Sequence, residues 1–148
     1  MIGIHTAIET NGFYGDKLSD KELADIDLVI LDMKAFGPEQ HKHVTAGIDN
    51  KPVIEFCRRL AALHRPMWLR YVLVPGLTDD EEEMERVAEF AKSLGVVERA
   101  EILPFHQMGR YKWEKLDLNY TLSQTPSPPP AAVARATDIF CAKGLNVV

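Results

Sequence analysis

Charged side chains lie at or just beyond the ends of several apolar segments of this sequence. Asp32 and Lys34 follow a short apolar run, Glu9 lies near the end of an earlier run, and His106 follows a later one. Carboxylates, amines and imidazoles are the groups that bind polar ligands and transfer protons in proteins. Because strand side chains alternate with a period of two, Asp32 and Lys34 leave their strand on the same side. These residues are therefore the first candidates for a functional site.

The apolar runs predict buried strands separated by amphipathic helices. Short apolar runs bounded by polar residues are typical of strands covered on both faces, as in a parallel sheet. We expect strands over residues 3–10, 27–34, 67–74, 97–105 and 145–148, and helices over 19–26, 38–47, 50–63, 78–94 and 131–143. Such an alternation requires parallel pairing with right-handed crossovers, so the predicted fold class is α/β.

Local signals mark where the helices begin. Ser19 and Thr78 are each followed three residues later by a glutamate, which predicts two capping boxes. The acidic run that ends at Glu83 favours the positive end of the helix dipole and indicates a solvated helix start. Residues 107–113 and 116–130 lack a clear period and are predicted to be loops.

A parallel sheet would bring the strand ends together. The carboxyl ends of parallel strands meet at one edge, so Glu9, Asp32, Lys34 and His106 are predicted to converge there. Arg70 lies inside the most hydrophobic strand, where a charged side chain requires a partner. Its partner is either an acid on a neighbouring strand or a carboxylate of a ligand or peptide, and the residues leave these two readings about equal.

Asp32 and Lys34 permit two kinds of chemistry. A partly buried lysine can form a Schiff base. Alternatively, the acid binds the ammonium and the base the carboxylate of a zwitterionic, amino-acid-like ligand. A neighbouring carboxylate stabilises the protonated amine, which disfavours the nucleophile.

Composition limits the classes of partner. The chain has 148 residues and a net charge of −5, which argues against nucleic acid or an anionic membrane as a partner. No apolar run approaches the roughly 20 residues that span a bilayer. We therefore expect one cytoplasmic domain over residues 1–148.

The cysteines and histidines do not predict a metal site. Cys57 and Cys141 fall within helical patterns, where we expect both to be small buried side chains. Neither has a second cysteine at metal-ligand spacing. His41 and His43 would point to different faces of a helix.

Four segments together resemble a known family. Residues 4–12, 31–34, 69–76 and 103–113 resemble, in order and spacing, the carboxyl-terminal part of the pyruvate formate-lyase activating enzyme family. These are radical S-adenosylmethionine enzymes of anaerobic metabolism that act on a glycyl radical protein. The resemblance implies a partial, half β/α TIM-like barrel, the carboxyl-terminal portion of a radical SAM barrel.

The resemblance also implies roles for the strand-end residues. Asp32, Lys34 and His106 fall on positions expected around S-adenosylmethionine, and Arg70 on a position at the cofactor or substrate-peptide end of the site. Glu9 and Asp32 fall on two acids that help to form a monovalent cation site, although the family usually has Asp where this chain has Glu9.

A partner surface is implied as well. The segment with Arg110, Lys112 and Trp113 lies where pyruvate formate-lyase, or another glycyl radical enzyme, is expected to dock.

The family's 4Fe-4S cluster motif has no counterpart in this chain. The three cysteines of that motif, and a Gly-Gly-Glu segment for the cofactor, belong to the first half of the family's sequence. We therefore expect an activase fragment that is inactive alone and carries no catalytic residue of its own. The alternatives are a non-catalytic module that binds a glycyl radical enzyme and a Schiff-base lysine aldolase.

One further expectation concerns assembly. An open strand at residues 3–9 would leave a sheet edge that could pair with another chain and form a homo-oligomer.

Overall fold

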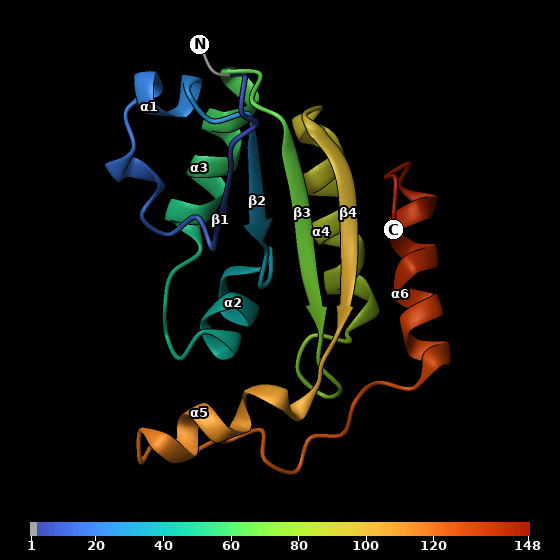
Figure 1. Ribbon diagram of the computed structural model, residues 1–148. Helices are drawn as coiled ribbons and strands as arrows, with labels where there is room; N and C mark the ends of the chain where they lie inside the picture. Colours follow the sequence, from blue (N-terminus) through green and yellow to red (C-terminus); the bar gives the residue numbers. More distant parts are fainter. Residues whose placement is uncertain (1–2) are drawn as a thin grey trace.

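The computed structural model describes residues 3–148 and contains one four-stranded sheet (Figure 1). The strands, in sheet order, are β1 (Ala7–Thr10), β2 (Leu28–Asp32), β3 (Met67–Leu73) and β4 (Val97–Pro104). Every neighbouring pair is parallel. The predicted α/β class is confirmed, and the open parallel sheet is consistent with a partial barrel.

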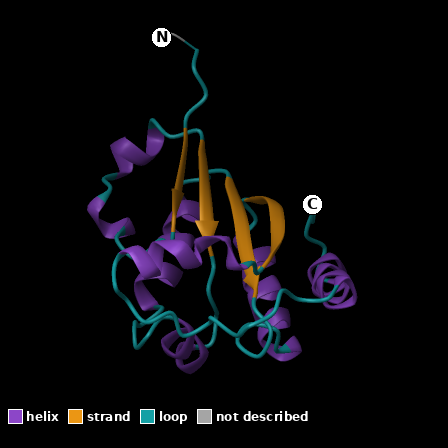
Figure 2. Ribbon diagram, turned by 60° about the horizontal axis from the view of Figure 1, so that its bottom comes forward, coloured by secondary structure: helices purple, strands orange, loops and turns teal. Residues whose placement is uncertain are grey.

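Helices lie between and after the strands, and some of them cover one face of the sheet. They are α1 (Asp20–Ala24), α2 (Pro38–Val44), α3 (Lys51–Ala62), α4 (Glu81–Leu94), α5 (Arg110–Lys115) and α6 (Pro130–Ala142), with short 3-10 turns η1 (Gly15–Lys17) and η2 (Gln107–Gly109). Helices α3 and α4 lie behind the sheet in Figure 1, and α6 lies along the β4 side. Figure 2, which brings the lower end forward, shows the same layering.

The two faces of the sheet differ in burial. Along β3, Met67, Leu69, Tyr71 and Leu73 are buried, whereas the side chains between them are only partly buried. The buried set packs in one hydrophobic cluster with the inner faces of α3, α4 and α6. The opposite face carries Arg70 and, by register, the polar residues of the neighbouring strands.

One of the two predicted capping boxes is present. The Ser19 hydroxyl accepts a hydrogen bond from the Glu22 amide and caps α1, and the Glu22 carboxylate accepts one from the Ser19 backbone N–H. The prediction at Thr78 was wrong, because Asp80 is the N-cap of α4. The Thr78 hydroxyl instead donates to the Val72 carbonyl (2.6 Å) and accepts from the Val74 amide. Thr78 therefore closes the turn after β3.

Several other boundaries differ from expectation. The first strand begins at Ala7 rather than residue 3, and the final segment makes a single bridge, between Ala100 and Val147. Residues 110–115 form α5, where a loop was predicted. Cys57 is buried as expected, but Cys141 is exposed because it lies on the outer side of α6. His41 is buried and His43 exposed, as their spacing predicted.

No helix within residues 3–148 combines the length and the hydropathy that crossing a membrane requires.

Candidate functional site

The parallel strands place the predicted residues at one end of the sheet. β2, β3 and β4 point towards the lower end in Figure 1, where α2 and α5 lie. Asp32 is the last residue of β2, Glu9 lies one residue before the end of β1, and His106 follows β4 by two residues. Arg70 lies further inside, at the centre of β3.

Asp32 and Lys34 form the centre of this site. The Lys34 Nζ lies 3.8 Å from the Asp32 Oδ2, and their side chains are 33% and 26% exposed. Met33 and Ala35, which flank Lys34, are buried on the other side of the chain. At 3.8 Å the two groups attract each other without a direct hydrogen bond, so each keeps its hydrogen-bonding capacity for a ligand.

Arg70 is held by one acid on the neighbouring strand β4 and by one acid on β1, which lies two strands away. Its Nε donates to the Glu101 Oε2 at 2.8 Å, and its Nη1 lies 2.9 Å from the Glu9 Oε2. The hydrogen bond that Arg70 donates to Glu101, and then the one to Glu9, raise the pKa of the Arg70 guanidinium above its ordinary value. The ion-pair explanation for this buried charge is therefore confirmed; a ligand role stays a prediction.

Glu101 was missed by the sequence analysis. It lies on β4 opposite Arg70, its side chain is only 14% exposed, and it also faces the Arg99 Nε at 3.2 Å. Arg99 stacks over the Trp68 ring, with its Cζ 4.6 Å from the ring centroid. The spacing of two between Arg99 and Glu101 was the signal that could have placed both on the open face.

The acids predicted to hold a cation have other partners. Glu9 is 59% exposed and reaches across to Arg70, and Asp32 faces Lys34. Within residues 3–148 no group of three or more His, Cys, Asp or Glu side chains is placed to hold a metal ion. A cation at Glu9 and Asp32 would have to compete with these ion pairs, and this site stays a prediction.

His106 lies apart from the other rim residues. It is exposed, and its Nδ1 accepts a hydrogen bond from the Met108 amide at 3.3 Å, which begins η2. No ion pair or hydrogen bond joins His106 to Asp32 or Lys34 among the described residues. Its Nε2 is the ring nitrogen that is left to bind a ligand at the rim.

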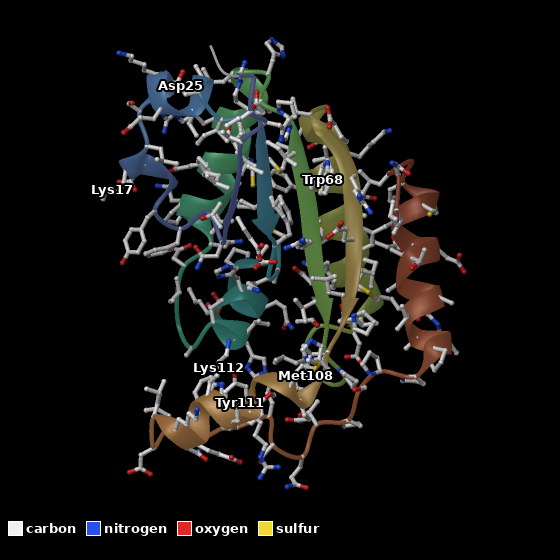
Figure 3. All side chains as sticks on the ribbon, viewed as in Figure 1. Lys17, Asp25, Trp68, Met108, Tyr111 and Lys112 are labelled. Carbon is white, nitrogen blue, oxygen red and sulfur yellow. The ribbon has the colours of Figure 1, made fainter. Side chains whose placement is uncertain are left out.

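The predicted partner segment folds as a short exposed helix. In α5, Arg110 pairs with Glu114 at 2.9 Å, and Trp113 packs against Tyr120 with ring centroids 5.5 Å apart. Figure 3 shows Met108, Tyr111 and Lys112 together at the end of the molecule towards which β3 and β4 point. The exposed apolar side chains of this region are Met108, Tyr111, Trp113, Leu116 and Leu118.

Glu83 contradicts the prediction of a solvated helix start. Its side chain is 2% exposed. Its Oε1 accepts hydrogen bonds from the Phe36 and Gly37 amides, which follow Lys34 along the chain. Nothing in the local pattern distinguished Glu83 from its exposed neighbours, because the two backbone amides that it binds lie more than 40 residues away in sequence.

The cysteines do not fit an iron–sulfur cluster. Cys57 lies in the buried face of α3, where burial raises the pKa of its thiol to about 12, and Cys141 lies on α6. A cluster needs several deprotonated thiolates that converge on one point. The described residues do not provide that set.

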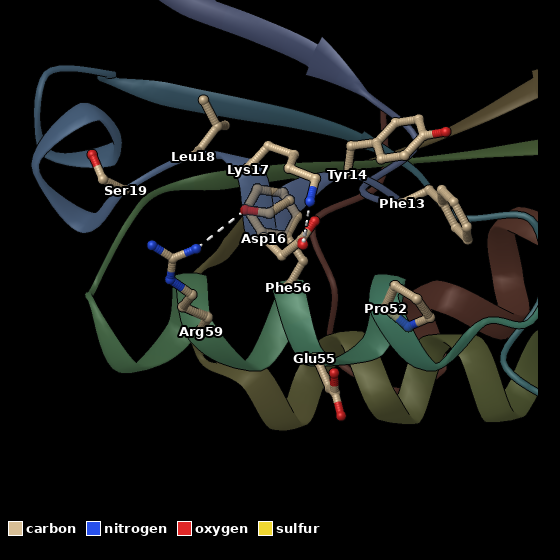
Figure 4. A pocket seen from close by; sticks show the side chains of 11 residues that line it. Phe13, Tyr14, Asp16, Lys17, Leu18, Ser19, Pro52, Glu55, Phe56 and Arg59 are labelled. Carbon is tan, nitrogen blue, oxygen red and sulfur yellow. Dashed lines mark hydrogen bonds and ion pairs between the residues drawn. The ribbon is translucent and has the colours of Figure 1, made fainter.

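A pocket of about 770 Å³ lies elsewhere, between η1 and α3 (Figure 4). Tyr14 and Phe56 line it, and Arg59 crosses it to donate a hydrogen bond to the Gly15 carbonyl at 3.1 Å. None of the rim residues line this pocket. The candidate site is therefore the open, polar end of the sheet.

A protein-family model matches more than half of the chain. The model of the radical SAM superfamily matches residues 1–91. This range includes β1, β2 and β3 and ends within α4.

Two relatives are similar to this chain over nearly its whole length. The chain is 42% identical over 145 residues to the pyruvate formate-lyase-activating enzyme of Streptococcus mutans, and 36% identical over 148 residues to the pyruvate formate-lyase 1-activating enzyme of Escherichia coli K12. These alignments cover 93% and 99% of this chain. The chain spans only 54% and 60% of the length of these relatives.

A solved structure supports the fold. A domain of a pyruvate-formate lyase-activating enzyme from Bacteroides vulgatus superposes with a TM-score of 0.78 at 22% sequence identity. The superposition covers 99% of this chain and 81% of that one.

Proposed function

This chain belongs to the radical SAM superfamily, and we propose that it is the carboxyl-terminal part of a pyruvate formate-lyase activating enzyme. Residues 1–148 would act as a single domain that forms one side of a partial barrel. The activity would be the generation of a glycyl radical on pyruvate formate-lyase or another glycyl radical enzyme. The names of the relatives and the match in order and spacing of the four sequence segments support this proposal.

The observation that carries the proposal is the Asp32–Lys34 pair at the strand ends. An acid and a base 3.8 Å apart can bind both ends of the zwitterionic methionine moiety of S-adenosylmethionine. We propose that the Asp32 carboxylate accepts from the ligand ammonium and that the Lys34 ammonium binds the ligand carboxylate. Both side chains are about one-third exposed or less, so the ligand would displace little bound water.

His106 and Arg70 would complete the cofactor contacts. His106, at the end of β4, has one ring nitrogen free to bind the cofactor once Nδ1 has accepted from Met108. Arg70 forms ion pairs with Glu101 and Glu9 and would fix the orientation of both acids. Its remaining N–H groups would contact the cofactor.

When bound, S-adenosylmethionine supplies the group that is cleaved to start radical chemistry. The reduction of the cofactor requires a 4Fe-4S cluster, which the residues of this chain do not fit. We therefore propose that this chain contributes cofactor and partner binding, that cluster ligands come from residues outside it, and that it is inactive alone.

A chimera tests the proposed activity. The part of the Streptococcus mutans enzyme that this chain does not cover would be fused to residues 1–148, and glycyl radical formation on pyruvate formate-lyase measured by electron paramagnetic resonance. We expect a radical signal from the chimera and none from residues 1–148 alone. A chimera that incorporates its cluster, binds S-adenosylmethionine and gives no radical would contradict the proposal.

Calorimetry tests the cofactor site directly. In the chimera, Asp32→Asn and Lys34→Met should each weaken S-adenosylmethionine binding by about tenfold or more, the effect of a lost charged hydrogen bond. Lys51→Met is the matched control, because Lys51 also lies 3.8 Å from a carboxylate, that of Glu55, but on the outer surface of α3. Residues 1–148 alone should bind the cofactor weakly, and tight binding by them would show that the missing contacts are unnecessary.

A second candidate function is a non-catalytic module that binds a glycyl radical enzyme. The exposed apolar side chains on and around α5 favour it, because contiguous apolar surface commonly marks a protein interface. Pyruvate formate-lyase should capture this chain in a pull-down, and Trp113→Ala should reduce the capture. Tyr14→Ala, at an exposed aromatic on the distant η1 side, serves as the control.

A further inference from the structure

We infer that Glu83 is a positioning residue for the Asp32–Lys34 pair, which it holds in place through the backbone that follows Lys34. This inference rests on the proposed role of that pair in cofactor binding. Glu83 itself lies on α4 and does not pair with either residue.

Two buried side chains fix the bend between β2 and α2. Glu83 Oε1 accepts from the Phe36 amide at 2.5 Å and from the Gly37 amide at 2.7 Å. Asn50, which is 5% exposed, donates from Nδ2 to the Phe36 carbonyl at 2.5 Å. Both backbone polar groups of Phe36 are therefore bound by side chains of other elements.

The charge of Glu83 strengthens this contact. Its Oε2 lies 2.6 Å from the Arg86 Nη2, so the buried carboxylate has a cationic partner. Hydrogen bonds that backbone amides donate to a carboxylate are roughly twice as strong as neutral ones. The bend is thus held more firmly than an ordinary surface loop.

The bend also fits closely against Glu83. A Cβ added at Gly37 would lie 3.0 Å from the Glu83 Oε2, closer than most real contacts allow. The Phe36 ring packs against Phe90 of α4, with centroids 4.9 Å apart. The position of residues 36 and 37 relative to α4 therefore has little freedom.

The attachment of Phe36 affects Lys34 because Lys34 lies between two residues whose backbone is fixed. On one side the Met33 amide donates to the Arg70 carbonyl at 2.9 Å. On the other side Phe36 is fixed by Glu83. Lys34 therefore cannot shift along the rim without breaking one of these contacts, and its ammonium stays near Asp32.

The alternative is that Glu83 only attaches α2 to α4. In that case its loss would reduce stability and free the bend, but the surroundings of the Lys34 side chain would not change. A measurement on Lys34 itself separates the two readings.

The test uses Glu83→Ala and Glu83→Gln, with Glu82→Ala as the control on the adjacent, exposed position. Hydrogen exchange measures the protection of the Phe36 and Gly37 amides. Competitive acetylation followed by mass spectrometry measures the reactivity of Lys34 relative to that of Lys51, whose side chain is 74% exposed. Both measurements use the full chain without cofactor.

We expect Glu83→Ala to speed exchange at both amides by about tenfold or more, because two charge-assisted hydrogen bonds are lost. It should also raise the acetylation of Lys34 relative to Lys51 several-fold. Glu83→Gln keeps an acceptor oxygen and should restore most of the protection, and Glu82→Ala should match the wild type. If Glu83→Ala does not fold, Gly37→Ala, which pushes the bend away from the carboxylate, should raise Lys34 acetylation instead.

Unchanged Lys34 acetylation in a folded variant with fast-exchanging amides would overturn the inference, as would amides that remain protected. Binding of S-adenosylmethionine to the chimera is measured separately. Absence of binding in the wild-type chimera would count against the proposed function, and the two cofactor-free measurements would still decide the role of Glu83. Binding unaffected by Glu83→Ala despite a mobile Lys34 would remove the link to the cofactor.

Discussion

Arg70 occupies an interior strand position because two acids compensate its charge. Its side chain is 24% exposed, and that of Glu101 only 14%. Removing Arg70 leaves the mostly buried Glu101 carboxylate with Arg99 as its remaining cationic partner, and that loss is more costly than the loss of a surface pair. The pair therefore contributes to stability whatever else Arg70 binds.

Arg70→Met should lower the free energy of unfolding by about 2 kcal/mol, measured by urea denaturation. Arg135→Met is the control, because its pair with Glu81 is about half exposed or more on both sides and should contribute at most about 1 kcal/mol. Equal effects of the two arginine variants would contradict this account.

The two cysteines should differ sharply in reactivity. Burial raises the pKa of Cys57 to about 12, whereas Cys141 is exposed. The thiolate is the reactive form, and at pH 8 only about one in 10⁴ thiols with that pKa is ionised. Iodoacetamide at pH 8 should therefore modify Cys141 at least about a hundredfold faster than Cys57, as mass spectrometry would show. Comparable rates in the folded protein would mean that α3 opens readily.

Residues whose partners are local could be predicted from the sequence, and those whose partners are distant could not. Ser19 and Glu22 are three residues apart, and their capping box formed as expected. Thr78 and Ser19 begin similar patterns, yet Thr78 closes a turn because its hydroxyl meets the end of β3. Glu83 looked like one more surface acid because its partners lie on a loop from another part of the chain.

At the scale of elements, the strand ends follow directly from the alternation of strands and helices. Parallel pairing put Glu9, Asp32 and His106 at the same end of the sheet, as predicted. The cross-strand ion pairs depend on register, which no single strand reveals. That is why Glu101, the direct neighbour of Arg70, was identified only from the structure.

The hydrogen bonds between Ser19 and Glu22 at the start of α1 should make the stability of the protein depend on pH. Hydrogen bonds from the Ser19 side chain and then from its backbone lower the pKa of Glu22 below the ordinary value of 4.5. A lowered carboxylate pKa stabilises the fold fully above pH 4.5, and this contribution is lost as the pH falls through the folded-state pKa. The stability difference between wild type and Glu22→Gln should therefore shrink between pH 6 and pH 3.

Urea denaturation at several pH values measures that difference. Glu82→Gln is the control, because Glu82 is an exposed first-turn acid of α4 that does not form the cap. The difference in the free energy of unfolding between Glu82→Gln and the wild type should change less over the same pH range. A difference for Glu22→Gln that grows as the pH falls would reverse the sign and refute the capping explanation.

At the scale of the whole molecule, the sheet has an outer edge at β1. β1 is a four-residue strand that pairs only with β2 in the described sheet. The other outer strand, β4, is partly covered by the bridge between Ala100 and Val147. Unpaired backbone groups along a strand can pair with another strand, and lysine on an edge strand discourages this.

We therefore expect residues 1–148 to self-associate through β1 when their concentration is raised, measured by sedimentation velocity. Ala7→Lys places a charge on an exposed position of that strand and should shift the distribution towards monomer. Ala134→Lys adds the same charge at an exposed position of α6, far from β1 in sequence, and should leave the distribution unchanged. If both variants act alike, net charge rather than strand pairing governs the association. A wild-type chain that stays monomeric at every concentration would show that the short, partly polar β1 is protected enough on its own.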